Sequence, residues 1–263
     1  MSIIRFDENP LIVPGDVKPS RSDFEVVCAF NAGCIRFNDE ILLLMRVAER
    51  PPIGPDYVIA PILHPEDPSQ GIDLFRVDRS NPAFEEIDSR LFSYKGKTYL
   101  TSISHLRIAR SRDGRNFIID ERPAIFPEMR DEEYGVEDPR ITQLGDKYYI
   151  NYTAVSGNGI TTALAVTKDF VRFERRGVIF APENRDVTIF PEKIGGRYVC
   201  YHRPVAKLIG GADIWLAGSP DLINWGNHQH VCGPRSGMWD EYKIGGGAVP
   251  IKTEKGWLEI YHG

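Results

Sequence analysis

The stretch GDKYYINYTAV, residues 145–155, contains the pattern that decides the fold. A Gly-Asp pair, which favours a tight turn, precedes a run of aromatic and β-branched residues that favour strands. The same arrangement occurs at five places and predicts a β-hairpin at each. The five turn pairs are Asn38-Asp39, Lys95-Gly96, Gly145-Asp146, Gly195-Gly196 and Lys255-Gly256.

A second pattern lies between these hairpins. The segments LRIARSRDGRNF, ALAVTKDFVRF and IWLAGSPDLINW each read as a strand followed by Ser/Thr-x-Asp and then an aromatic residue. Their aspartates are Asp113, Asp169 and Asp221. Both patterns recur at intervals of about fifty to sixty residues, which is typical of a propeller blade of four short strands.

We therefore predict an all-β chain that forms one catalytic domain over residues 1–263, a five-bladed β-propeller. The alternative is a large β-sandwich, which the near-equal spacing of the turn pairs disfavours. The second pattern is missing after the last turn pair. We therefore expect the last blade, and the C-terminal part of the domain, to be incomplete in this chain.

The composition is that of a soluble globular protein, with 42% hydrophobic and 26% charged residues. A formal net charge of −5 gives no basic field for nucleic acid, so an anion can bind only at a local cluster. Residues 1–7 lack a signal-peptide core, and the apolar run at residues 41–45 is too short to span a membrane. We expect a cytoplasmic protein that binds neither nucleic acid nor membrane.

The four cysteines, Cys28, Cys34, Cys200 and Cys232, show no C-x-x-C spacing. In a cytoplasmic protein we expect them to be reduced, with Cys28 and Cys200 buried in apolar strands. No metal site is expected.

The segment YGVEDPR, residues 134–140, places two carboxylates before a proline. Successive side chains of an extended segment point to opposite faces, so only Glu137 or Asp138 can face a given ligand. The alternative is a turn in which Asp138 caps backbone amides and Arg140 forms an ion pair. On these residues alone the turn interpretation is the stronger one.

Cationic side chains gather around one hairpin, in NRDVTIFPEK and YHRP. Guanidinium and imidazole groups together suit an oxyanion, because arginine binds phosphate through paired donors. Surface ion pairs with Glu183, Asp186 and Glu192 explain the same residues about equally well.

Several of these segments together resemble glycoside hydrolase family 130, the β-mannoside phosphorylases and related β-mannosidases. The resemblance rests on FNAGCIRFNDEILLLMRVAER, YGVEDPRITQLGDKYYINYTAVS, FAPENRDVTIFPEKIGGRYVCYHRP, IWLAGSPDLINWG and GGGAVPIKTEKGWLEIYHG. Within the family, the chain is most similar to the branch that acts on β-1,2-linked mannosides. Family members continue beyond the Tyr-His-Gly segment by about one blade.

The resemblance implies a reaction as well as a fold. Asp138 would be the sole catalytic carboxylate, protonating the glycosidic oxygen through a hydroxyl of the bound mannose. Inorganic phosphate would be the nucleophile and co-substrate, so that no cofactor is needed and mannose 1-phosphate forms with inversion. The implied phosphate ligands are Arg185, Lys193, His202, Arg203 and Tyr261. The implied substrate contacts are Asn31, Arg46, Arg50, Ser104 and Asp186.

Two other functions stay open on the sequence. One is a β-mannosidase of the same family that uses Glu192 or Glu241 as the base, because an inverting hydrolase needs a second carboxylate to activate water. The other is a carbohydrate-binding propeller without turnover. The expected partners are a small carbohydrate and phosphate, and a homo-oligomer is compatible with the sequence.

Overall fold

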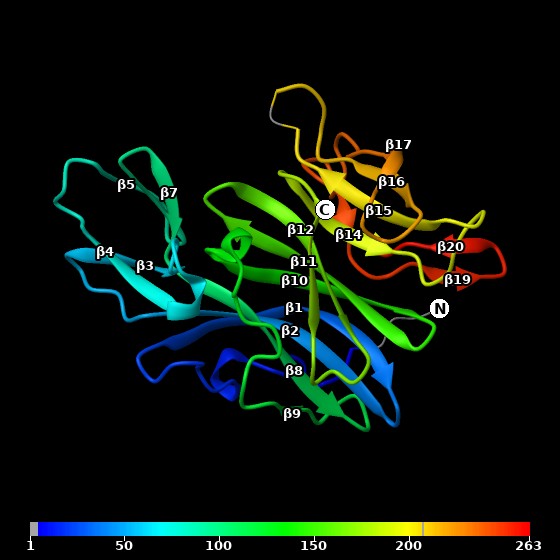
Figure 1. Ribbon diagram of the computed structural model, residues 1–263, viewed down its shortest axis with the longest axis horizontal. Helices are drawn as coiled ribbons and strands as arrows, with labels where there is room; N and C mark the ends of the chain where they lie inside the picture. The colour runs from blue at the N-terminus through cyan, green and yellow to red at the C-terminus, as the bar shows by residue number, and fades with distance from the viewer. Residues whose placement is uncertain (1–4, 207) are drawn as a thin grey trace. The chain divides into compact units, whose positions relative to one another are not determined.

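The computed structural model describes residues 5–206 and 208–263 and consists almost wholly of β-strands (Figure 1). Within those residues, helix is limited to three short 3-10 turns, η1 (Pro14–Asp16), η2 (Pro68–Gln70) and η3 (Arg130–Glu132). The predicted all-β class is thus confirmed. No helix in the described part of the chain is long and apolar enough to cross a membrane. The chain divides into two compact units, Met1–Glu137 and Asp138–Gly263, which are described separately below.

The first unit is built on a sheet whose two longest strands, β1 (Glu25–Phe37) and β2 (Glu40–Arg50), form an antiparallel hairpin. β2 also pairs with β8 (Ile103–Ser111), which in turn carries β9 (Ile118–Ile119). The strand β10 (Gly135–Leu144) begins beside β8, where Gly135 pairs with Ser104. A Cβ at Gly135 would lie 2.6 Å from the Ser104 nitrogen, so this close approach requires glycine.

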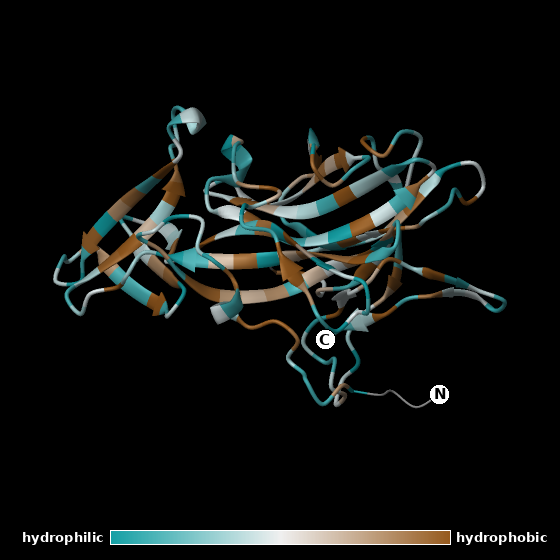
Figure 2. Cartoon of the chain, turned by 90° about the horizontal axis from the view of Figure 1, so that it is seen from below, coloured by the Kyte–Doolittle hydropathy of each residue, from teal (hydrophilic) through white to brown (hydrophobic). Residues whose placement is uncertain are grey.

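Two smaller sheets complete the first unit. Their strands are β3 (Tyr57–Leu63) paired with β4 (Ile72–Asp78), and the meander β5 (Phe84–Asp88), β6 (Leu91–Tyr94) and β7 (Lys97–Leu100). Both sheets contribute to one apolar core around Val58, Val77 and Phe92. Figure 2 shows hydrophobic and hydrophilic bands following one another along many strands, as the two-residue period of a half-buried strand predicts.

The second unit contains strands of an eight-stranded sheet, a separate four-stranded sheet and two short hairpins. The first sheet continues β10 with β11 (Lys147–Ser156), β12 (Gly159–Thr167) and β13 (Glu174–Phe180). The second has the order β14 (Asn184–Ile189), β15 (Tyr198–Pro204), β16 (Ile214–Ser219) and β17 (Gly226–Cys232). The short pairs are β18 (Gly245–Gly246) with β21 (Tyr261–His262), and β19 (Ile251–Thr253) with β20 (Gly256–Leu258). Leu164, Phe180, Val187 and Ile189 belong to the core that the two sheets share.

The five predicted turn pairs all fall at reversals of the chain. Four lie where predicted, and positive φ angles at Asn38, Lys95, Gly145 and Gly195 mark them. The fifth turn is displaced by one residue, because Gly256 already pairs with Thr253 as the first residue of β20.

The Ser/Thr-x-Asp segments share one local structure, which explains their repetition. After β12, the Thr167 hydroxyl accepts a hydrogen bond from the Phe170 N–H, and Asp169 Oδ1 accepts from the N–H groups of Val171 and Arg172. Ser111 with Asp113, and Ser219 with Asp221, repeat this network after β8 and β16. These hydrogen bonds lower the pKa of all three aspartates. The second sequence pattern is therefore a turn motif.

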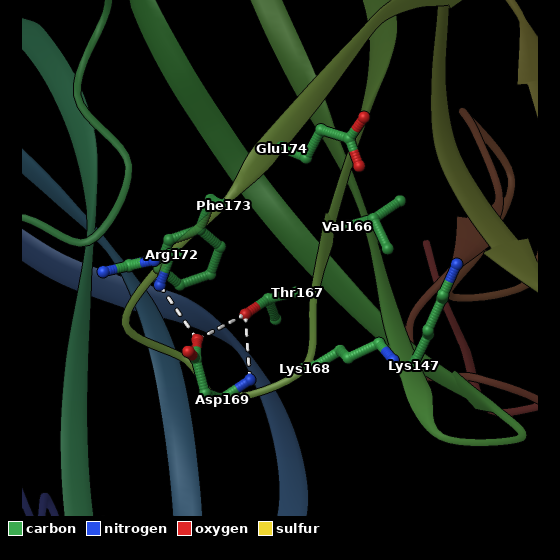
Figure 3. A pocket seen from close by; sticks show the side chains of 8 residues that line it. All are labelled: Lys147, Val166, Thr167, Lys168, Asp169, Arg172, Phe173 and Glu174. Carbon is green, nitrogen blue, oxygen red and sulfur yellow. Dashed lines mark hydrogen bonds between the residues drawn. The ribbon is translucent and has the colours of Figure 1, made fainter.

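The turn at Asp169 also borders a surface hollow of about 560 Å³ (Figure 3). Its cations include Lys168, which is paired with Asp146 at 2.6 Å. Asp169 itself is tied to Thr167 and to the backbone of Arg172, as the dashed lines in Figure 3 show. The hollow contains none of the residues that the sequence assigns to the site.

All four cysteines are free thiols, as predicted. Cys200 is fully buried, which confirms its assignment to the core. Cys28 is exposed, and the prediction that it is buried was wrong. It lies in β1 at a register irregularity between Val26 and Cys28, where simple alternation of buried and exposed residues breaks down.

Candidate active site

Three of the residues assigned to the site have an unusual backbone. Asn31 in β1, Asp138 in β10 and Asp186 in β14 lie inside strands with φ angles of 47°, 48° and 54°. The strand ladders shift register around Asn31 and around Asp186. Positive φ is costly for residues other than glycine, and strand bulges that redirect a side chain are common next to active sites. Three of the predicted site residues thus share a backbone conformation that is costly for residues other than glycine.

Asp138 is followed by an arginine that folds back onto the main chain. Arg140 Nη1 donates to the carbonyl oxygens of Asp138, at 3.1 Å, and of Pro139, at 3.3 Å. Its Nη2 donates to the Gly246 carbonyl at 3.2 Å. The sequence had suggested an ion pair for Arg140, whereas its hydrogen bonds go to carbonyl groups.

Asp186 forms a buried ion pair with Arg203. Arg203 Nη2 and Nε lie 2.6 and 2.7 Å from Asp186 Oδ2, and the two side chains are only 7% and 6% exposed. His262 Nε2 lies 3.4 Å from the same oxygen. Burial opposes ionisation, but the hydrogen bond from His262 and the charge of Arg203 outweigh it and lower the pKa of Asp186 to about 2. Asp186 is thus a fixed anion at neutral pH.

A glycine makes room for this ion pair. A Cβ at Gly245 would lie 2.1 Å from Asp186 Oδ2 and 3.0 Å from His262 Nε2. The strand β18 can approach β14 this closely only because it consists of glycine.

His202 is buried and has hydrogen-bond partners at both ring nitrogens. Asn184 Nδ2 donates to Nδ1 at 2.9 Å, so the ring proton is on Nε2, which donates to His228 Nδ1 at 3.0 Å. Burial, together with His228, lowers the pKa of His202 to about 4. The ring also stacks on Phe180, with 4.8 Å between the centroids. His202 is therefore a neutral hydrogen-bonding group.

The β14–β15 hairpin brings together only some of the residues that were predicted to bind phosphate. Arg185 and Arg203 are direct partners in the ladder, and Arg185 Nε is buried without a hydrogen-bond partner. Lys193 is exposed in the loop beyond β14, with its Nζ 4.5 Å from the ring centre of Tyr198. Tyr198 is five residues before Arg203 in β15, about 16 Å away at about 3.3 Å per residue. Lys193 thus lies at the other end of the hairpin.

Tyr261 lies in a separate cluster. Its hydroxyl donates to Asp240 at 2.9 Å and accepts from Arg235 at 3.2 Å, and its ring stacks on Trp239. Neighbouring residues of a strand point to opposite faces, so while His262 faces Asp186, Tyr261 faces away from it.

Glu259 is a half-buried acid that the sequence analysis did not single out. Its Oε1 accepts from the Thr188 hydroxyl at 3.4 Å, and its Oε2 is buried without a hydrogen-bond partner. Burial raises the pKa of Glu259 to about 8, although Thr188 and the charge of Arg140 act in the opposite direction. The signal in the sequence was an acid between the aromatic residues of WLEIY, at every second position of a strand-like run.

In the first unit, a second polar group surrounds Arg46. Arg46 Nη2 pairs with Glu137 at 2.6 Å, and Arg46 Nε donates to the buried Ser104 hydroxyl at 3.1 Å. Its guanidinium also lies 4.7 Å from the ring centre of Phe30. The first unit thus brings Arg46 and Ser104 together. Arg50, the other predicted contact on this strand, pairs with Glu25 at 2.7 Å.

The opposite face of β2 and β8 carries a fully buried charged cluster. Glu49 Oε1 lies 2.7 Å from His105 Nε2 and 3.8 Å from Arg107 Nη2. Because side chains alternate along both strands, this cluster lies behind the strand positions of Arg46 and Ser104. Such networks fix strand register when their members are hydrogen-bonded.

The residues described in the structure contain no group of three or more His, Cys, Asp and Glu side chains arranged to hold a metal ion. The expected independence of cofactors stays a prediction.

These features belong to an all-β enzyme, and its fold is similar to those of glycoside-processing enzymes. A solved structure of β-1,2-mannobiose phosphorylase from Listeria innocua, in complex with β-1,2-mannobiose, superposes with a TM-score of 0.94 and 48% identity. The match covers 100% of this chain and 75% of that one. Another solved structure comes from work on glycoside hydrolases of the mannoside phosphorylase family that target β-1,2 linkages in Candida mannan. It superposes with a TM-score of 0.68 at 20% identity, which supports the fold alone.

Sequence comparison identifies the family. The model described as beta-1,4-mannooligosaccharide phosphorylase matches residues 77–263. The Listeria innocua β-1,2-mannobiose phosphorylase is 50% identical over 268 residues, covering 100% of this chain and 75% of that protein. A 1,2-β-oligomannan phosphorylase from Thermoanaerobacter is 39% identical over 61% of this chain and 53% of that protein. The chain belongs to glycoside hydrolase family 130.

Proposed function

We propose that this protein cleaves β-mannosides with inorganic phosphate, and that its substrates are β-1,2-linked manno-oligosaccharides. The observation that carries the proposal is the 50% identity, over the whole chain, to a β-1,2-mannobiose phosphorylase. The second relative, an oligomannan phosphorylase, supports the same linkage.

The reaction needs one acid and one nucleophile. A phosphate oxygen attacks the anomeric carbon from the face opposite the leaving group, and the bond from that carbon to the glycosidic oxygen breaks. Asp138 supplies the proton that this oxygen takes up, by way of a mannose hydroxyl. Attack from the opposite face inverts the configuration, so a β-mannoside yields α-mannose 1-phosphate and a shortened acceptor.

Phosphate is already a competent nucleophile, so the protein needs only to position it and to neutralise its charge. Arg185 suits this task, because its buried Nε lacks an acceptor that an anion would supply. We propose that Arg203 contributes charge beside it. His202 has both ring nitrogens hydrogen-bonded to neighbouring side chains, so it would support the site through Asn184 and His228.

The rival hydrolase needs a second carboxylate as the base. Glu192, one candidate, pairs with Lys252 at 2.6 Å and is 46% exposed. Glu241, the other, accepts a hydrogen bond from the Gly237 N–H and is exposed. Both side chains have ordinary surface partners, which favours phosphorolysis.

The remaining expectations belong to the same proposal. We propose that the complete domain closes as a five-bladed propeller around the substrate, with Asn31, Arg46, Arg50, Ser104 and Asp186 as sugar contacts. A cytoplasmic location, independence of cofactors and a homo-oligomeric state also stay predictions.

A panel of β-mannobioses of different linkage, incubated with and without phosphate, tests the proposal. We expect release of mannose 1-phosphate from the β-1,2-linked compound only when phosphate is present. Free mannose formed without phosphate would support the hydrolase, and sugar binding without cleavage would support a binding protein.

A further inference from the structure

The hydrogen bonds of Arg140 converge on main-chain oxygens around Asp138. Its guanidinium joins the carbonyl groups of Asp138 and Pro139 to that of Gly246, a residue more than a hundred positions later in the sequence. Arg140 is buried, and its Nε has no hydrogen-bond partner. The buried guanidinium of Arg140 therefore fixes the main chain at Asp138, the proposed acid.

This backbone needs such support. Asp138 has a φ of 48°, a left-handed conformation that side chains other than glycine adopt at a cost, and Pro139 follows it directly. A strained conformation persists only where its surroundings hold it in place. The hydrogen bonds from Arg140 to the carbonyl groups of Asp138 and Pro139 provide that restraint.

Glu259 and Arg140 both lie next to Gly246. A Cβ at Gly246 would lie 3.0 Å from Glu259 Oε1, while the carbonyl group of the same glycine accepts from Arg140. The charge of Arg140 acts on Glu259, so the two groups are electrostatically coupled. Both have one buried polar atom without a partner, Nε of Arg140 and Oε2 of Glu259.

We propose that Arg140 is a positioning residue for the reaction and that it holds the main chain of Asp138 in the productive conformation. Glu259, while it is uncharged, does not draw the Arg140 guanidinium away from the carbonyl groups. Once ionised, Glu259 would compete with the carbonyl oxygens for the guanidinium, because charged acceptors form the stronger hydrogen bonds. The inference rests on the proposed function, in which Asp138 is the acid.

The other titratable groups around Glu259 do not supply a competing charge. Tyr201 on β15 and Cys232 on β17 both interact with it. Burial, with Glu259 adding to it, raises the pKa of both groups, so they are neutral where Glu259 titrates. Arg140 is thus the charged group whose position responds to Glu259.

The first experiment follows kcat from pH 6 to 10 in the full chain, with saturating β-1,2-mannobiose and phosphate. It compares wild type with Glu259→Gln, a neutral isostere, and with Glu254→Gln, which removes an exposed carboxylate on the neighbouring hairpin. We expect an alkaline decline with an apparent pKa of about 8 in wild type and Glu254→Gln, and its loss in Glu259→Gln. Ionisation of phosphate affects all three alike and cancels in the comparison. No decline in wild type, or an unchanged decline in Glu259→Gln, would overturn the proposal.

The second experiment uses Arg140→Lys, which keeps the charge but cannot bridge several carbonyl groups with one planar fork. A displaced acid should lower kcat by about ten- to a hundredfold and leave the KM for mannobiose within about twofold. An unchanged kcat, or a rise in KM alone, would contradict a positioning role. If this variant does not fold, the pH comparison still decides.

The failure of this inference differs from failure of the proposed function. If wild type forms no mannose 1-phosphate, the proposed function is wrong. If wild type is active and Asp138→Asn is not, but the alkaline decline survives in Glu259→Gln, only the role of Glu259 and Arg140 is wrong.

Discussion

Asp138 and Asp186 have nearly the same φ angle, 48° and 54°, but the contacts that hold them differ. Asp186 is held by its side chain, through the ion pair with Arg203 and the contact with His262. Asp138 is held by its carbonyl group, to which Arg140 donates. An arginine holds each of the two positions, Asp186 through its carboxylate and Asp138 through the main chain.

The different contacts fit different roles, Asp186 as a permanent anion and Asp138 as the proposed general acid. Burial opposes ionisation of Asp186, but the hydrogen bond from His262 and the charge of Arg203 outweigh it and lower the pKa of this carboxyl group to about 2. A general acid must instead be able to give up and regain a proton near the working pH. The hydrogen bond from Arg140 to the Asp138 carbonyl fixes the main chain that carries this carboxyl group. The comparison predicts catalytic loss at one aspartate and loss of stability at the other.

The largest expected effect is on turnover at Asp138. Asp138→Asn preserves the size of the side chain but removes the transferable proton, so kcat should fall by about 10²–10⁴-fold. Thermal unfolding should be nearly unchanged. Rates with unactivated β-1,2-mannobiose measure the effect, and near-normal turnover of the variant would reject Asp138 as the acid.

The neighbouring carboxylate is the matched control. Glu137 pairs with Arg46 at 2.6 Å, so Glu137→Gln should weaken that contact and alter turnover less than Asp138→Asn does. An equal loss in both variants would remove the distinction between the two adjacent positions.

The next largest effect is on stability at Asp186. Asp186→Ala leaves Arg203 buried without its carboxylate, which typically costs about 3–5 kcal/mol of unfolding free energy. Chemical denaturation measures this cost. In wild type, the low pKa of Asp186 contributes stability above an ordinary pKa of 3.8 that is lost as the pH falls from 3.8 towards 2. A wild-type acid profile shared by Asp186→Ala would contradict the role of this ion pair.

The smallest expected effect is on the use of phosphate. Arg185→Ala removes a charge-assisted contact, so the KM for phosphate should rise by about tenfold, the equivalent of about 1.4 kcal/mol. His202→Ala should raise the KM for phosphate less, because the ring is neutral and hydrogen-bonded to Asn184 and His228, and should also lower stability, because the ring packs on Phe180. Phosphate saturation curves identical to wild type would mean that this cluster is structural.

Local patterns predicted much of the fold. The turn pairs and the Ser/Thr-x-Asp segments depend on backbone conformations that few residue types adopt, so they can be read from the sequence. The positions of Cys28 and of the fifth turn were missed because each depends on strand register, which neighbouring strands determine.

The candidate site was predicted less completely. Resemblance to a family pointed to Asp138, Asp186 and Arg203, but the sequence did not show that Asp186 and Arg203 form a pair. Lys193 and Tyr261 were grouped with Arg185 by proximity in the sequence or by analogy, whereas hairpin length and strand alternation place their side chains elsewhere. Glu259 was missed because burial, rather than residue type, gives the carboxyl group its raised pKa.

The central claim is that phosphate, and not water, attacks the mannoside. Proton NMR of β-1,2-mannobiose incubated with the full chain, at increasing phosphate concentration, tests it directly, because the anomeric signals distinguish the products. We predict that α-mannose 1-phosphate forms in equal amount to free mannose from the acceptor, at a rate that saturates with phosphate and vanishes without it. Two equivalents of mannose per disaccharide, formed at a rate independent of phosphate, would contradict the account.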